Sequence, residues 1–314
     1  MVSFVEYKNE LSWINDSACA SPESFVKETE EAFHKNLRSI AKKIKEAKGG
    51  SKLVLLFGPS SSGKTTTSHL LQTALNHIGI GSTIISLDDF YRGESQAPLL
   101  PNGQHDYESV QALNIPEIEK CLLGLLQKNS CDMPLFNFEV RKPYPYRRHV
   151  ELEENDIAIV EGIHALNPVI TQNLPDHGVR KIYISVKQGI RDDRTELFNA
   201  NDMRLIRRIV RDFNFRGTDP ERTLRMWPDV MDGERKYIKP FRSEVDYTIN
   251  SLHLYETCVL KDQAISILKK VPQQCGQYEF AQKLIGNLSV FESIDCGLVP
   301  KDSILREFIG GGEY

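Results

Sequence analysis

Short runs of apolar residues recur along the chain, and stretches with helical spacing of apolar positions separate them. The apolar runs fall at 53–57, 83–87, 157–160, 181–186 and 245–249. Continuous runs of this kind are typical of strands that are buried on both faces. Helical spacing is found at 115–128, 202–213, 219–239 and 254–270. Because strands alternate with helices, we predict an α/β fold with a mostly parallel five-stranded sheet flanked by helices.

The two ends of the chain have their own patterns. Residues 1–22 show no clear period and predict an arm. Ser21 and Pro22 are typical of an N-cap and a first helical position, and apolar residues then recur at helical spacing up to Gly49. In the C-terminal tail, one more helix is predicted near 277–288. We therefore expect three parts: an N-terminal arm and helix (1–50), a central domain (51–271) and a helical C-terminal extension packed on that domain (272–314).

The charge balance and the cysteines narrow the class of protein. The chain has 314 residues, and its 39 Lys and Arg against 43 Asp and Glu give a net charge of −4. A mildly acidic chain has no global attraction for nucleic acid or anionic membranes, so any basic site must be local. The six cysteines are scattered, as in reduced cytosolic proteins. Without a signal-peptide pattern or a membrane-length apolar stretch, the cytoplasm is the expected location, and a homo-oligomer stays open.

A glycine-rich motif directly follows the first apolar run. It matches G-x-x-x-x-G-K-[ST], with Gly58, Pro59, Ser60, Ser61, Ser62, Gly63, Lys64 and Thr65, and Thr66 follows it. Glycines let backbone amides approach phosphate oxygens, and the start of the following helix adds its positive end. Lys64 would reach the β- and γ-phosphates, and the Thr65 hydroxyl would ligate Mg²⁺. The motif predicts a P-loop NTPase-type fold that binds ATP and Mg²⁺, because a strand precedes it and a helix follows it.

Carboxylates follow two other predicted strands. Glu161 ends the run at 157–160, at the edge of the sheet where ligands of open α/β sheets bind. We interpret it as a metal or water ligand, and the alternative is an acid that only caps a helix. Asp88 and Asp89 end the run at 83–87. Phosphoryl transfer to a hydroxyl needs a group that accepts the proton, and Asp88 is our candidate, with a second role near the metal. Asp89 stays the alternative base, and either carboxylate could be an N-cap.

Arginines are concentrated in one short segment. The group comprises Arg204, Arg207, Arg208, Arg211, Arg216, Arg222 and Arg225. At helical spacing, several of them share one face, and an acidic protein with such a face needs an anionic partner. The charge on a transferring phosphoryl group is the partner that we favour over surface salt bridges or nucleic acid. We predict a lid at about 202–240 in which Arg207 and Arg211 are catalytic, Arg208 and Arg216 bind ATP, and Arg204 contacts the acceptor.

These motifs, in this order, resemble the uridine kinase and phosphoribulokinase family. The stretch 86–92 looks like the family's segment with a catalytic Asp and a substrate-contacting aromatic, Tyr91, and 204–212 looks like its lid. The likeness is closer to a bacterial-type branch of uridine (nucleoside) kinases, in which a domain similar to part of threonyl-tRNA synthetase usually precedes the kinase. That domain has no counterpart in this sequence. The segments most similar to the branch are 159–168, 225–228 and 303–311.

The sequence departs from the family in the expected acceptor pocket. Where uridine kinases carry Asp-His-Pro, this chain has Asp106, Tyr107 and Glu108. Phe136 and Asn137 stand where they carry Tyr-Asp. The resemblance implies that the pocket is lined by Asp88, Tyr91, Tyr107, Glu108, Phe136 and Asn137, with Arg204. The alternative is that Phe136 belongs to the core and Glu108 begins a helix.

The resemblance implies a reaction between ATP and a small-molecule acceptor, without a membrane or nucleic acid as partner. We expect phosphorylation of the 5′-hydroxyl of uridine or cytidine, as in pyrimidine salvage. A kinase for a sugar phosphate, pantothenate or glycerate is the first alternative, because Arg141, Lys142, Arg147 and Arg148 could bind an anionic acceptor. An ATP-binding regulatory or RNA-associated module with weak catalysis is the second.

Overall fold

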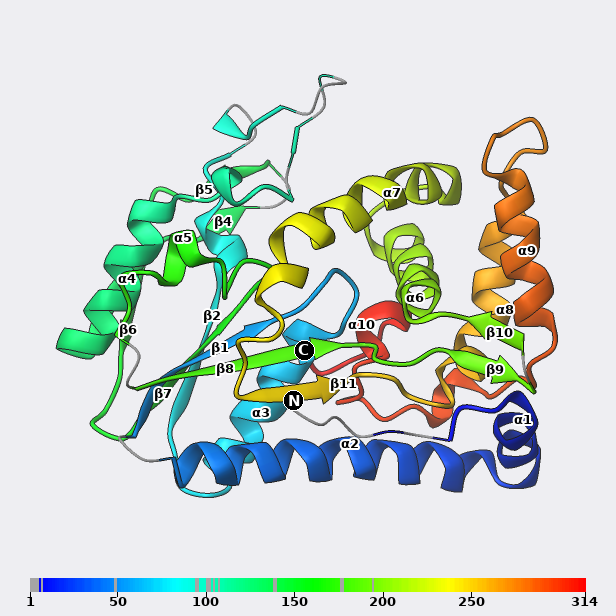
Figure 1. The fold of residues 1–314 in the computed structure, drawn as a ribbon, viewed down its shortest axis with the longest axis horizontal. Coiled ribbons are helices and arrows are strands. Elements are labelled where there is room, and N and C mark those ends of the chain that lie inside the picture. Colours follow the sequence, from blue (N-terminus) through cyan, green and yellow to red (C-terminus); the bar gives the residue numbers. More distant parts are fainter. Residues whose placement is uncertain are drawn as a thin grey trace.

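A parallel sheet lies at the centre of the molecule, and helices cover both of its faces (Figure 1). The computed structural model describes residues 6, 8–47, 50–93, 96–99, 103, 105–106, 108–137, 140–175, 178–193 and 195–314. Within these residues, five strands form the sheet in the order β11–β8–β1–β7–β2, and each neighbouring pair is parallel. The strands are β1 (Ser51–Phe57), β2 (Ser82–Ser86), β7 (Ile157–Glu161), β8 (Gly178–Ser185) and β11 (Tyr247–Asn250). The predicted mostly parallel sheet is confirmed.

Side chains alternate along each strand between two hydrophobic cores. On β1, Val54 and Leu56 belong to one core, whereas Leu53, Leu55 and Phe57 belong to the other. All five are almost fully buried. This double burial explains why the strands have continuous apolar runs in place of an alternation between apolar and polar residues.

The helices divide between the two faces. The helices are α1 (Leu11–Ala20), α2 (Pro22–Lys45), α3 (Lys64–Asn76), α4 (Ile115–Lys128), α5 (Pro168–Thr171), α6 (Ala200–Phe215), α7 (Pro220–Tyr237), α8 (Glu256–Leu268), α9 (Tyr278–Ser289) and α10 (Arg306–Ile309). Buried residues of α2, α3, α6, α8 and α9 share the core that contains Val54, whereas those of α4 and α5 share the core that contains Leu53. Figure 1 shows α2 running along one side of the molecule, beneath the sheet.

The N-terminal segment contains a helix that the hydrophobic pattern did not predict. Leu11, Ile14 and Ala18 of α1 are buried at helical spacing. Three apolar contacts in a ten-residue helix are too few to stand out from the polar residues around them. The following helix was predicted, and Pro22 is its first residue after the N-cap Ser21.

In the part of the chain that the structure describes, three small antiparallel pairs lie outside the main sheet, and they were also not predicted. They are β3 (Ser130–Met133) with β6 (Arg148–Glu151), β4 (Phe136–Asn137) with β5 (Lys142–Pro143), and β9 (Ile190–Asp192) with β10 (Thr195–Phe198). These strands have two to four residues each and carry many charges. Runs this short have no readable period, so tertiary contacts decide their conformation.

The last part of the chain returns to the middle of the molecule. After α9, the chain forms a 3₁₀ turn at Cys296–Leu298 and then α10, which packs on α6 (Figure 1). A buried hydrogen-bond cluster connects three distant segments, because the Tyr255 hydroxyl contacts both Glu30 of α2 and Ser303, which precedes α10. The predicted helix near 277–288 corresponds to α9.

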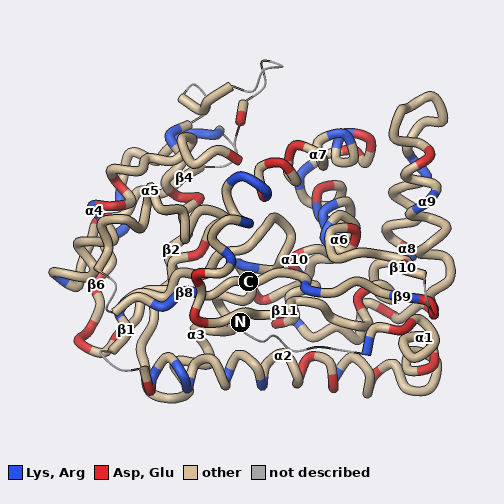
Figure 2. The backbone as a smooth tube through the Cα atoms, viewed as in Figure 1, with Lys and Arg blue, Asp and Glu red and all other residues tan. Residues whose placement is uncertain are grey.

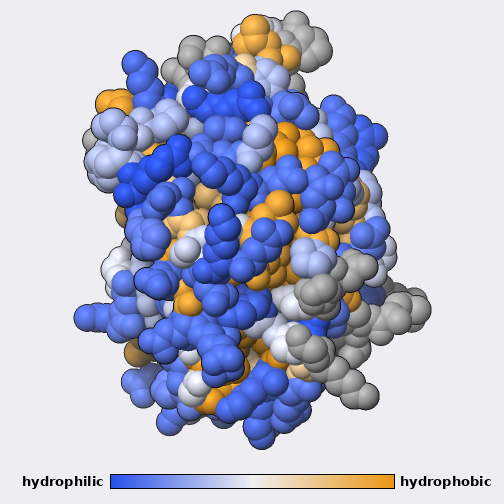
Figure 3. All heavy atoms as spheres, turned by 90° about the vertical axis from the view of Figure 1, so that its left-hand side faces the viewer, coloured by the Kyte–Doolittle hydropathy of each residue, from blue (hydrophilic) through white to orange (hydrophobic). Residues whose placement is uncertain are grey.

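One face of the molecule is drawn with its side chains in Figure 3. Seen from the side that carries α4 and β6, it is largely hydrophilic, with apolar side chains visible in separate patches (Figure 3). Among the described residues, no helix combines the length and the hydrophobicity that a membrane span requires.

Candidate active site

The loop between β1 and α3 has the backbone shape that the glycine-rich motif predicts. Gly58 has to be glycine, because a Cβ atom there would lie 2.1 Å from the backbone oxygen of Ile184. Gly63 has a left-handed backbone with φ of 84° and immediately precedes Lys64, the first residue of α3. Ser61 is also left-handed, with φ of 59°, which is uncommon for a residue other than glycine. The loop thus curls around the start of a helix, which is the arrangement that binds phosphate.

Several polar groups of this loop are free to meet a ligand. The hydroxyls of Ser61 and Ser62 are buried and have no hydrogen-bond partner among the described residues. Lys64 Nζ donates to the backbone oxygen of Pro59 at 3.2 Å, whereas Thr65 is exposed. Thr66 is buried in the first turn of α3. Buried hydroxyls are normally paired, so the loop fits a polyphosphate that would complete their hydrogen bonds.

The two predicted acidic groups lie on either side of one serine. Ser86 Oγ donates to Glu161 Oε1 at 2.7 Å and accepts from the backbone N–H of Asp88 at 3.3 Å. Burial raises the pKa of Glu161 to about 7, and the charge of Asp88 adds to that effect while Lys64 opposes it. The pKa of Asp88 is also raised by loss of water in the cleft, against the charges of Lys64 and Arg216. Strands β2 and β7 therefore bring both carboxylates to the P loop.

The donor set near the P loop fits Mg²⁺. The carboxylates of Asp88 and Glu161, of which Asp88 raises the pKa of Glu161, and the exposed Thr65 hydroxyl are hard oxygen ligands. Among the described residues, no three His, Cys, Asp or Glu side chains form a metal-binding group by themselves. Mg²⁺ at kinase sites needs only one or two carboxylates, because phosphate oxygens and water supply the other ligands.

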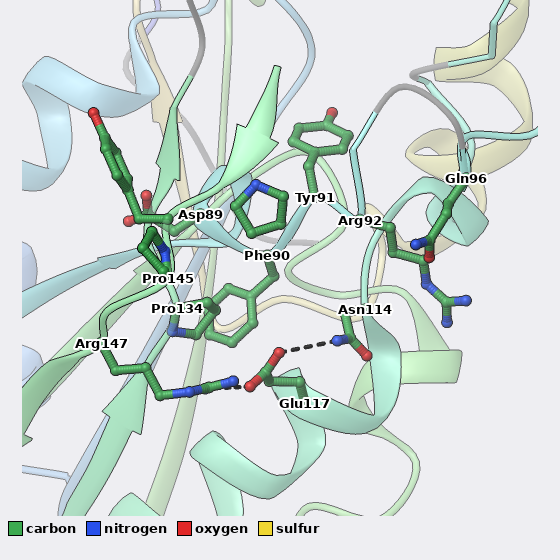
Figure 4. Close-up of a pocket in the computed structure, with 12 residues that line it drawn as sticks. Asp89, Phe90, Tyr91, Arg92, Gln96, Asn114, Glu117, Pro134, Pro145 and Arg147 are labelled. Atoms are coloured by element: carbon green, nitrogen blue, oxygen red, sulfur yellow. Dashed lines mark hydrogen bonds and ion pairs between the residues drawn. The ribbon is translucent and has the colours of Figure 1, made fainter. Parts of the chain in front are cut away.

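Asp88 and Asp89 point into different hollows. Asp88 lines the cleft beside the P loop, whereas Asp89 lines a second hollow of about 350 Å³. In this second hollow, Asp89 Oδ1 accepts the backbone N–H of Phe136 at 3.1 Å, and Glu117 pairs with Arg147 and Asn114 (Figure 4). Asp89 is thus bound to the β4–β5 hairpin.

The cleft beside the P loop has a volume of about 590 Å³ and collects most of the predicted phosphate-binding residues. Its lining includes Ser60 to Thr65, Asp88, Tyr91, Glu108, Glu161, Arg208, Arg211 and Arg216. Burial raises the pKa of Glu108, against the opposing charges of Arg208 and Lys64. Of the other predicted acceptor residues, Phe136 and Asn137 lie in β4 and do not line this cleft, and Tyr107 lies outside the described residues. The ring of Phe136 lies 5.8 Å from that of Tyr91.

Three arginines surround a single carboxylate at the edge of the cleft. Asp212 Oδ1 accepts from Nε and Nη2 of Arg211 at 2.9 and 2.8 Å. Asp212 also pairs with Arg208 at 3.2 Å and with Arg216 at 3.8 Å. Arg208 in addition donates to Ser60 Oγ at 2.9 Å. One carboxylate leaves these three cations with an excess positive charge, which suits an anionic ligand.

Arg204 and Arg207 do not reach the cleft, which differs from the sequence prediction. Both lie behind the P loop and are almost fully buried. Arg204 pairs with Glu234 of α7 at 2.5 Å and donates to the Ser60 backbone oxygen at 3.2 Å. Arg207 pairs through two nitrogens with Glu256 of α8 and donates to the Ser61 backbone oxygen at 3.3 Å.

This arrangement corrects the roles assigned to Arg204 and Arg207. Helical spacing predicted that Arg204, Arg207, Arg208 and Arg211 share one helix. It did not indicate which of these side chains face the cleft and which face the interior. Figure 2 shows basic positions along α6, which lies below α7 in this view. The helix is anchored on both sides by buried apolar residues, so two of its arginines become internal supports of the loop.

Sequence reasoning missed several residues of the cleft. They come from α7 and from the C-terminal segment, and include Met226, Asp229, Asp232, Lys236, Tyr237 and Glu307. The only signals for them were the segments 225–228 and 303–311, which resemble the bacterial-type branch without indicating a role. Long-range packing, which no local pattern encodes, brings both segments to the P loop.

Comparison with known proteins agrees with this site. The sequence profile of the phosphoribulokinase / uridine kinase family matches residues 53–257, which include the P loop, both carboxylates and the arginine segment. The chain therefore belongs to this family of P-loop kinases.

Uridine kinases are among the curated relatives. The uridine kinase of Schizosaccharomyces pombe is 30% identical over 200 residues, which cover 61% of this chain and 38% of that protein. The uridine kinase of Lactobacillus helveticus is 28% identical over 199 residues, which cover 63% of this chain and 85% of that protein. The chain thus spans less than half the length of the fungal relative. A solved phosphoribulokinase from Rhodobacter spheroides has a TM-score of 0.45 and 17% identity, and the match covers 64% of this chain and 70% of that chain.

Proposed function

We propose that the chain transfers the γ-phosphoryl group of ATP to the 5′-hydroxyl of a pyrimidine nucleoside. The observation that carries the proposal is that Asp88 faces the same cleft as Lys64 and the P loop, within range of the Lys64 charge. Phosphoryl transfer requires a phosphate cradle and a hydroxyl-orienting acid at one place. The uridine kinases among the relatives support the choice of acceptor.

In the proposed reaction, the P loop and Lys64 bind the polyphosphate. Thr65, Glu161 and Asp88 would hold Mg²⁺, which supplies charge neutralisation on the phosphate oxygens. Asp88 orients the acceptor hydroxyl and takes its proton as the new O–P bond forms and the bond between the γ-phosphorus and the β-bridging oxygen breaks. ADP and the nucleoside monophosphate are the products. A raised pKa makes the Asp88 carboxylate a stronger base than an ordinary aspartate.

The acceptor is proposed to lie beside Tyr91 and Glu108, which line the cleft on the Asp88 side. Of the cations that the sequence offered for a phosphorylated acceptor, Arg147 pairs with Glu117, and Arg148 donates to the Ile84 backbone oxygen at 3.0 Å. Neither lines the cleft, whereas Lys236 of α7 does. The choice of an uncharged acceptor therefore rests mainly on the uridine kinases among the relatives.

A screen of acceptors tests the proposal. ADP release is measured with uridine, cytidine, glycerate, pantothenate and a phosphorylated sugar at equal concentrations. We expect release to depend on uridine or cytidine and the product to be the nucleoside monophosphate. Release that depends on a phosphorylated sugar and not on any nucleoside would contradict the choice of acceptor, whereas ATP binding without turnover would contradict the kinase proposal.

A further inference from the structure

The C-terminal segment beyond the family match contributes a side chain to the cleft. The match ends at residue 257, and Glu307 of α10 nevertheless lines the cleft together with Lys64 and Glu161. Glu307 Oε1 lies 4.0 Å from Arg211 Nη1, and the exposed fractions of the two side chains are 23% and 8%. Glu307 Oε2 is buried without a hydrogen-bond partner among the described residues.

Hydrogen bonds and packing fix the position of the segment that carries Glu307. The Arg306 guanidinium donates to the backbone oxygens of Cys296, Val299 and Gly310, and its Nε donates to that of Pro300. Ile304 packs against the P loop, because a Cβ atom at Gly63 would lie 3.2 Å from its Cδ1. The Phe308 ring lies 5.3 Å from the Arg207 guanidinium carbon. A side chain on such a support has a fixed position relative to the loop.

Arg211 is the group that Glu307 can control. Nε and Nη2 of Arg211 are both bound to Asp212, and Nη1 faces Glu307. Asp212 binds only one edge of the Arg211 guanidinium, and it also forms ion pairs with Arg208 and Arg216. Glu307 places a second carboxylate within ion-pair distance of Nη1, the nitrogen that Asp212 does not bind.

Building on the proposed kinase function, we propose that Glu307 is a positioning residue that holds Arg211 toward the γ-phosphoryl group of ATP. Arg211 stabilises the negative charge of the transferring group. Glu307 does not contact the reacting atoms, and it acts by fixing where the Arg211 charge lies. The C-terminal segment then contributes to catalysis through Arg211, in addition to packing on the hydrophobic core.

The test compares Glu307→Gln with a control at a nearby exposed acid, Glu313→Gln. The glutamine keeps the size of this partly buried side chain, so the melting temperature should stay within about 2 °C of wild type, less than the shift expected for about 1 kcal/mol in a large domain. We expect kcat to fall roughly 10-fold, as for the loss of one partly buried charge-assisted contact, with KM for the acceptor nearly unchanged. Glu313→Gln should keep wild-type kinetics.

A double-mutant cycle separates positioning of Arg211 from any other role. In an Arg211→Ala background, Glu307→Gln should reduce kcat by less than about 2-fold, because coupled residues are not additive. Binding measured by calorimetry gives a readout without turnover. Glu307→Gln should weaken the binding of the imido analogue of ATP roughly 5-fold, again the worth of one such contact, and leave ADP binding unchanged.

Three results would overturn this inference. They are wild-type kcat in Glu307→Gln, an equal loss in the presence and absence of Arg211, or an equal weakening of ADP and imido-ATP binding. The wild-type enzyme is assayed first. If it shows no kinase activity, the proposed function of the chain is contradicted; if it is active, the variants test the positioning role of Glu307. Glu307→Asp, which keeps the charge but shortens its reach, should lie between wild type and Glu307→Gln.

Discussion

Asp88 and Asp89 are neighbours in the chain, yet their side chains lie in different hollows. Both lie in the 3₁₀ turn at Leu87–Phe90 that follows β2, and in a helix of three residues per turn successive side chains point in different directions. Asp88 remains exposed to the cleft, where a hydroxyl could approach it. Asp89 is bound to the Phe136 backbone and so fastens the β4–β5 hairpin.

Substitution of each aspartate by asparagine should separate these roles. Asp88→Asn should lower kcat by roughly 10²- to 10⁴-fold, the usual contribution of a general base, with little change in ATP binding. Asp89→Asn should reduce activity far less, because an amide oxygen can still accept the Phe136 N–H. Steady-state kinetics of both variants decide the matter, and the reverse ranking would mean that Asp89 is the base.

Glu161 links the chemistry of the site to stability. The unfolded chain releases this proton near pH 4.5, whereas the folded protein holds it up to about pH 7 because burial disfavours the carboxylate. The folded state therefore binds more protons in this interval and loses relative stability as the pH rises through it.

Glu161→Gln should remove this pH dependence in the ligand-free protein. The melting temperature should rise by roughly 3 °C at pH 8, the shift expected for about 1 kcal/mol in a large domain, and change little at pH 5, while activity is lost. Thermal unfolding at both pH values measures the effect, with the exposed Glu154→Gln as control. An identical gain at pH 5 and pH 8 would show that burial of the charge is not its cause.

At the scale of elements, α6 supports the P loop from behind. Arg204 and Arg207 bind the backbone oxygens of Ser60 and Ser61, and their charges are balanced by Glu234 of α7 and Glu256 of α8. Ser61 has a left-handed backbone that costs free energy, so it needs such support. Three helices thus contribute to the shape of one short loop.

Arg207→Met should destabilise the protein by about 3 kcal/mol or more, because it leaves Glu256 as a buried, unpaired charge. Urea unfolding measures the loss. Replacement of Glu256 by Gln in the same chain should recover part of it. The matched control is Arg225→Met, which breaks an exposed pair with Glu221 and should cost less than about 0.5 kcal/mol. Unchanged stability together with a raised KM for ATP would show that Arg207 contacts substrate after all.

The sequence predicted those elements whose local pattern is strong. The five buried strands and the P loop follow from continuous apolar runs and a specific motif, and α4 begins and ends where its pattern predicts. The side chains that face the cleft from α6 could not be distinguished, because Arg204 and Arg211 have the same local signature. Only tertiary contacts separate them, because Arg204 pairs with Glu234 and the Ser60 backbone behind the P loop, whereas Arg211 faces Glu307 in the cleft.

At the scale of the whole molecule, the cleft is assembled from segments that are distant in the chain. The P loop, the turn after β2, the end of β7, α6, α7 and α10 all contribute to its lining. The carboxyl ends of parallel strands meet at one edge, which explains how β1, β2 and β7 bring their motifs together. Glu307 arrives from the far end of the sequence, and no periodic pattern could have placed it there.

The choice of acceptor is a property of the whole cleft. If Glu108 hydrogen-bonds ribose hydroxyls, uridine should be phosphorylated with a higher kcat/KM than 2′-deoxyuridine, because a buried polar group left unpaired rejects the analogue. Glu108→Ala should narrow that difference. Parallel kinetics with both nucleosides provide the measurement, and equal kcat/KM values in the wild type would remove the ribose-reading role from Glu108.

Transfer of the γ-phosphoryl group in this cleft is the central claim, and one labelling experiment tests it most directly. The protein is incubated with Mg²⁺, uridine and ATP labelled at the γ-phosphate, and the products are separated. We predict that label appears in uridine monophosphate with the wild type and is absent with Lys64→Ala, which retains the fold but lacks the charge at the transferring group. Label in uridine monophosphate at the same rate with Lys64→Ala, or label only in inorganic phosphate with the wild type, would contradict the account.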